Sequence, residues 1–154
     1  MGTPMTPPQA HRALVVARWG AAFGVALLMI GALQPWADIR SVSEGYYDKG
    51  YATDMFPVAA LIACGALLCS ARLVRGPHRG RGLGLAGIVV GWLGVLLLWM
   101  WIPVWNASLS DERVIAESGI ALVSFGFAAV TVAVWAAATL ERAAQRVDAS
   151  TPAP

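Results

Sequence analysis

Four long segments of the chain contain almost no charged side chains. They are Trp19–Trp36, Met55–Ala71, Leu83–Trp105 and Gly119–Leu140. As α-helices they would be about 27, 26, 35 and 33 Å long, and the hydrocarbon core of a bilayer is about 30 Å thick. A backbone in lipid must satisfy its hydrogen bonds within its own segment, so each segment is predicted to form one transmembrane helix.

The predicted fold is an all-α membrane protein, a bundle of four transmembrane helices in up-down-up-down order. The expected spans cover residues 16–36, 55–74, 83–105 and 119–140, all within one domain of residues 13–146. Residues 1–12 and 147–154 are expected to be disordered cytoplasmic tails. Only 13% of the residues are charged, against about 25% in soluble domains, which argues against a soluble globular domain.

The basic residues indicate the orientation. Four spans place both termini on one side, which would hold eight of the eleven basic residues: Arg12, Arg18, Arg72, Arg75, Arg79, Arg81, Arg142 and Arg146. The opposite side would hold Arg40, Lys49 and Arg113. Since basic residues concentrate in cytoplasmic segments, both termini are predicted to be cytoplasmic, in a multi-pass protein of the plasma membrane. Arg72 is expected to extend to the lipid headgroups.

Small residues predict how the helices pack. A stripe of glycines in the third span is spaced by four, three, four and three positions: Gly80, Gly84, Gly87, Gly91 and Gly94. Small residues let helix backbones approach closely in lipid. The stripe is therefore expected to pack within the chain, or alternatively against a second copy.

The large apolar residues suggest which surfaces meet lipid. Leu96, Leu97 and Leu98 are expected to face the acyl chains. Trp36 is expected in the aromatic belt at the membrane surface. The deeper Trp92 and Trp135 are expected to pack between helices.

The residues needed for chemistry are missing or badly spaced. Cys64 and Cys69 would lie about 140° apart on one helix and cannot pair with each other. His11 and His78 have no further ligands at metal spacing. We therefore predict no enzyme activity, no cofactor and no metal ion. We interpret the basic residues as a signal of membrane topology and not as a surface that binds nucleic acid.

The segment between the first two spans, Ala37–Met55, is polar and rich in tyrosine. Its candidate partner-contact residues are Tyr46, Tyr47, Asp48, Lys49 and Tyr51. Aromatic side chains among mixed charges are typical of protein interfaces. The alternative is a solvated loop that folds back on the bundle.

A short motif and the order of segments carry a resemblance. The first span closes with Leu33-Gln34-Pro35-Trp36-Ala37, followed by a glycine-containing loop, an Ala/Leu-rich span, an Arg-rich turn and a Gly-rich span. This layout resembles uncharacterised four-span proteins of high-GC bacteria, among them the tryptophan-biosynthesis-associated membrane protein family. The Ala/Gly/Arg-rich composition also suggests a bacterial source. The resemblance implies a four-span membrane protein but no reaction.

Two functional classes are compatible with these features. The first is a non-enzymatic accessory subunit that binds another membrane protein within a larger membrane or envelope assembly. The second is a homo-oligomeric pore or small-molecule transporter formed by self-association. A pore needs polar groups along its wall, and the candidates are scattered: Ser70, Ser124, Thr131 and Thr139. The accessory subunit is therefore the preferred prediction.

Overall fold

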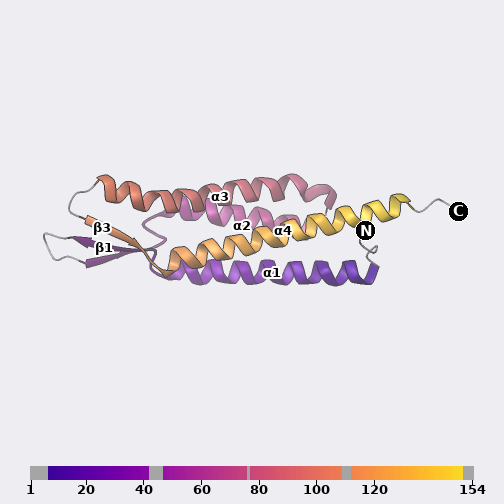
Figure 1. Ribbon diagram of the computed structural model, residues 1–154, viewed down its shortest axis with the longest axis horizontal. Coiled ribbons are helices and arrows are strands. Elements are labelled where there is room, and N and C mark those ends of the chain that lie inside the picture. The colour runs from indigo at the N-terminus through magenta and orange to yellow at the C-terminus, as the bar shows by residue number, and fades with distance from the viewer. Residues whose placement is uncertain (1–6, 42–46, 76, 109–111, 151–154) are drawn as a thin grey trace.

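Four long helices lie lengthwise beside one another, and a small β-sheet lies at one end of the bundle (Figure 1). This computed structural model describes residues 7–41, 47–75, 77–108 and 112–150. The helices are α1 (Pro7–Leu33), α2 (Phe56–Arg75), α3 (Pro77–Ser108) and α4 (Ser118–Ser150). The strands are β1 (Ala37–Ser41), β2 (Tyr47–Gly50) and β3 (Glu112–Ala116).

All four helices are long and apolar enough to cross a membrane, as the sequence predicted. The candidate spans are Arg12–Leu33, Phe56–Arg75, Gly82–Val104 and Ser118–Ala143. The first helix ends at Leu33 and not at residue 36, because Pro35 disfavours helical geometry in the residue before it. Helix α1 begins at Pro7 and α4 continues to Ser150, so the helices include parts of both segments that were expected to be disordered.

The sheet was not predicted. Strand β1 lies between β2 and β3 and is antiparallel to both. Its register places Ala37 opposite Gly50 on one side and Ala116 on the other. Ala37 and Val114 are buried, whereas Arg40 and Ile115 are exposed, so one face of the sheet packs on the bundle. The segment expected to be a solvated loop is thus partly strand.

Trp36 joins the sheet to the helices, and its side chain does not reach the surface of the molecule. Its side chain is 1% exposed, and its indole Nε1 donates to the Gly31 carbonyl at 2.9 Å. Its backbone N–H donates to Gly50, and its carbonyl accepts from the N–H of Glu117. The expectation that the Trp36 side chain faces the membrane surface is therefore wrong, because it is buried in a core cluster with Met55, Leu98 and Ile120.

The helices pack most closely as two pairs, α1 with α4 and α2 with α3. A Cβ added at Gly24 would lie 2.7 Å from the Gly126 carbonyl oxygen, and one added at Gly65 would lie 2.5 Å from Gly91 Cα. Real Cβ atoms do not come so close. Both pairs therefore depend on glycine, which lets the backbones touch.

The glycine stripe of α3 faces other helices of the same chain. Gly87 lies against Cys69 of α2, and Gly94 lies against Ile62 of the same helix. Gly91 lies under the Phe127 ring of α4, and Gly84 lies beside the Arg72 side chain. The surroundings of Gly80 lie outside the described residues.

Of the other five large residues whose positions were predicted, three have the expected burial or exposure and two do not. Trp92 packs edge to face on Phe127, and Leu96 and Leu97 are exposed. Leu98 is fully buried because it lies one turn after Val95, on the inward stripe of α3. Trp135 is 65% exposed because it shares the outward face of α4 with Phe125 and Val132.

Replacing Gly91 by leucine should destabilise the bundle. An added Cβ alone would lie 1.9 Å from Cζ of the buried Phe127, and overpacking of this kind costs about 1–3 kcal/mol. We expect thermal aggregation in detergent at a lower temperature for Gly91→Leu. The control Leu97→Ala alters an exposed side chain of the same helix and should change little. Equal melting of Gly91→Leu and the parent would show that this contact is not needed.

Candidate functional site

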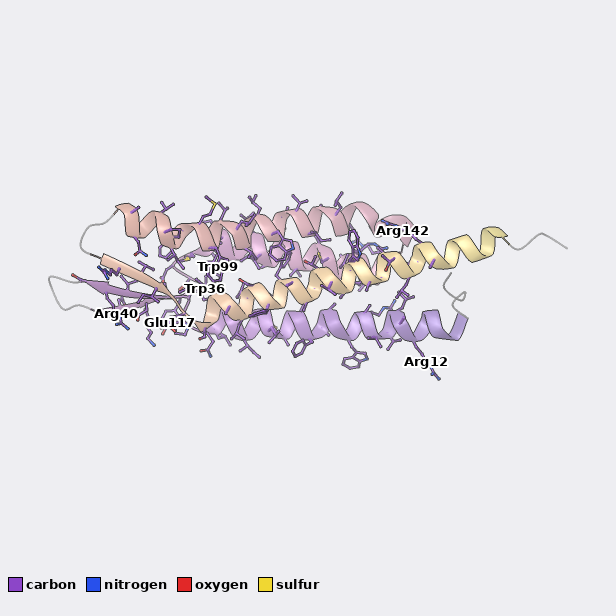
Figure 2. The ribbon with its side chains drawn as sticks, viewed as in Figure 1. Arg12, Trp36, Arg40, Trp99, Glu117 and Arg142 are labelled. Atoms are coloured by element: carbon purple, nitrogen blue, oxygen red, sulfur yellow. The ribbon has the colours of Figure 1, made fainter. Side chains whose placement is uncertain are left out.

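The described members of the predicted contact set lie on β2 and directly after it. Asp48 and Tyr51 are exposed and Lys49 is partly exposed. Tyr47 belongs to β2, but its side chain lies outside the described part of the structure, as does all of Tyr46. Figure 2 shows Arg40, Trp36 and Glu117 at this end of the bundle, and Arg12 and Arg142 at the other.

The outer edge of β2 is closed by two carboxylates. The Gly50 carbonyl accepts from Trp36, so Gly50 faces β1, and its neighbours Lys49 and Tyr51 face outward. The Lys49 N–H donates to Asp48 Oδ1 at 2.8 Å, and the Tyr51 N–H donates to Asp54 Oδ2 at 2.6 Å. These two acidic side chains therefore satisfy backbone groups that would otherwise face solvent.

The outer edge of β3 is closed by one asparagine from α3. Asn106 Nδ2 donates to the Val114 carbonyl at 3.0 Å, and Val114 N–H donates to Asn106 Oδ1 at 2.7 Å. The amide thus takes the place of a neighbouring strand. Open sheet edges invite pairing with other chains, so this sheet is built to present side chains and not to accept an added strand.

An acidic side chain is buried on β1. Asp38 Oδ2 accepts from Arg40 Nη2 at 2.8 Å and from Arg40 Nε at 3.1 Å. The Asp38 side chain is 4% exposed and that of Arg40 is 58% exposed. Asp38 Oδ1 has no partner in the described part of the chain. Asp38 therefore holds the Arg40 guanidinium on the sheet.

A more deeply buried ion pair joins α2 to α4 near the end of the bundle away from the sheet. Both guanidinium Nη atoms of Arg72 donate to the two carboxylate oxygens of Glu141, one of them at 3.3 Å. The side chains are 5% and 16% exposed. The expected extension of Arg72 to the headgroups is wrong, because Glu141 and the space beside Gly84 hold it inside.

The four hydroxyl groups that the sequence offered as pore-lining candidates all form hydrogen bonds. Each donates to a carbonyl of its own helix: Ser70 to Ala66, Ser124 to Ile120, Thr131 to Phe127 and Thr139 to Ala136. Two of them also accept from indoles of α3, Thr131 from Trp92 at 3.2 Å and Ser124 from Trp99 at 3.0 Å. These bonds join α3 to α4.

The two cysteines lie apart. Cys64 is exposed on α2, Cys69 is buried, and neither forms a disulfide. Among the described residues no three His, Cys, Asp or Glu side chains come together at metal-binding distance.

Comparison with known proteins finds no relative of this chain. No family model, curated protein or solved structure matches the chain. Its function must therefore be argued from its own side chains. Of these, sequence reasoning missed Asp38, Asn106 and Glu141. Only Glu141 carried a signal, as an acidic residue one position beyond the expected span.

Removing one partner of the Arg72–Glu141 pair should destabilise the bundle. Arg72→Met leaves the Glu141 carboxylate without its partner, and breaking a buried pair in this way costs about 3–5 kcal/mol. The double variant Arg72→Met/Glu141→Leu removes both charges and should recover most of the loss. Thermal unfolding in detergent measures both effects. A single variant as stable as the parent would contradict a structural role for the pair.

Proposed function

We propose that the protein is a non-enzymatic subunit of a larger membrane or envelope assembly. It spans the plasma membrane with four helices in up-down-up-down order, with both termini in the cytoplasm. The excess of basic residues on the side of the termini supports this orientation. The sheet then lies on the outer side, where it contacts another membrane protein.

The observation that carries the proposal is the sheet itself. Segments that follow α1 and precede α4 pair along β1 and β3, and the two outer edges are closed by Asp48, Asp54 and Asn106. A linker between helices needs no such structure. An ordered surface with an exposed Tyr51 beside the exposed Asp48 is suited to recognition, because tyrosine is among the residues that contribute most to binding.

The alternative function is a pore formed by several copies of the chain. The polar groups of the spans argue against it. A water-filled path needs polar groups directed into it. The four hydroxyls donate within their own helices, as serine and threonine commonly do in membrane helices. The resemblance to the tryptophan-biosynthesis-associated family adds no reaction and stays a prediction.

The orientation can be tested with single cysteines in a Cys64→Ser/Cys69→Ser background. Thr53→Cys, in an exposed turn before α2, should react with a membrane-impermeant thiol reagent added outside. Ser150→Cys, at the end of α4, should react only after the membrane is permeabilised. Labelling of Ser150→Cys from outside would overturn the proposed orientation.

The partner can be tested by purification in mild detergent followed by mass spectrometry. We expect a protein that co-purifies in a fixed ratio with the parent chain. The double variant Lys49→Ala/Tyr51→Ala should bind it about tenfold more weakly, the effect of losing an interface tyrosine and its neighbour.

The control for this experiment is Arg12→Ala, an exposed change at the opposite end of the bundle, which should leave the partner bound. A homo-oligomer that lacks another protein and conducts ions in vesicles would contradict the accessory function and establish the pore.

A further inference from the structure

The basic residues at the sheet end of the bundle gather on one face of the sheet. Arg40, Lys49 and Arg113 are the only basic residues in the two segments that join α1 to α2 and α3 to α4. The register places Arg40 opposite Arg113, and Lys49 opposite Asp38. Directly paired residues share a face, as do residues two apart on a strand. All three cations therefore project from the same face.

Among the described residues of the sheet, the register places one acidic side chain, Asp38, on the same face as the three cations. Asp38 pairs with Arg40, but neither Lys49 nor Arg113 has an ion-pair partner in the described part of the chain. Asp48 belongs to the other face by its register with Ile39. Like charges directly opposite one another destabilise a sheet. The stability of the sheet alone therefore gives no reason for Arg113 to lie opposite Arg40.

The cationic face begins where the membrane-spanning helices end. The first span ends at Leu33 and the fourth begins at Ser118, while β1 begins at Ala37 and β3 ends at Ala116. Strands advance about 3.3 Å per residue, which puts Arg40 about 10 Å from Ala37. The headgroup layer is about 5–8 Å thick on each side. The cations thus lie within side-chain reach of phosphate groups.

We propose that this cationic face binds the phosphate of an anionic phospholipid. Arg40 and Arg113 would donate to its oxygens, since guanidinium groups suit phosphate well, with Lys49 as an added positive charge. Asp38 acts as a positioning residue for Arg40. A lipid fits this face better than an acidic protein, because a lipid also has acyl chains that contact apolar side chains. Exposed Ile115 lies on the same face as the cations, and Leu33, at the end of α1, is 81% exposed.

The test uses the purified full-length chain in neutral detergent. Added phosphatidylglycerol should raise its melting temperature in a saturable way, whereas phosphatidylcholine should not. The double variant Arg40→Gln/Arg113→Gln should need on the order of tenfold more phosphatidylglycerol, from the loss of two basic contacts. The control Arg12→Gln/Arg142→Gln removes the same charge from exposed residues at the other end and should respond like the parent.

A second measurement separates binding from folding. Without anionic lipid, Arg113→Gln should melt no lower than the parent, because it removes a repulsive pair. The conservative variant Arg113→Lys keeps the positive charge, so phosphatidylglycerol should raise its melting temperature almost as much as that of the parent. Equal responses of the two double variants would overturn the proposal. Equal protection by inorganic phosphate would overturn the lipid as the source, and protection by an acidic peptide without any preference for phosphatidylglycerol would assign the face to a protein.

Discussion

The fold depends on contact between helix backbones at glycine. Gly24 meets the Gly126 carbonyl in the α1–α4 pair, and Gly65 meets Gly91 in the α2–α3 pair. In lipid there is little hydrophobic drive between helices, so close van der Waals contact must hold them together. Between the two pairs the contacts are fewer, and they are made by specific groups: the Phe127 ring, two indole–hydroxyl hydrogen bonds and the Arg72–Glu141 ion pair.

The polar groups fall into two sets with different roles. Inside the bundle, hydroxyls, indoles and one ion pair bond to one another, as a medium of low polarity requires. At the sheet, Asp48, Asp54 and Asn106 are used to close strand edges. Among the described side chains of the sheet and the turn after it, Arg40, Arg113 and Tyr51 are exposed and Lys49 is partly exposed. These four side chains take no part in closing the strand edges.

The sequence was sufficient for the helices and insufficient for the sheet. The four spans are recognisable because a membrane demands long uncharged segments, and the glycine spacing marks the packed side of α3. Strands β1 and β3 were not predicted, because they are short and their partners lie far apart in the sequence. No local sequence pattern therefore indicates them. Trp36 and Arg72 were misplaced for a related reason: each is buried by residues far away in sequence. The Trp36 side chain lies in a core cluster with Leu98 and Ile120, and the Arg72 side chain pairs with Glu141.

The pairing of β1 with β3 also sets an order for assembly. The strand that follows α1 and the glycine side of α1 itself both contact residues after 111. Contacts between distant parts of a chain close late, because they must overcome the entropy of the loop between them. During synthesis, α2 and α3 can pair as a local hairpin before α1 meets its partner helix. The segment from β3 through α4 thus completes both the helix bundle and the sheet, so truncation before β3 would leave two unfinished structures.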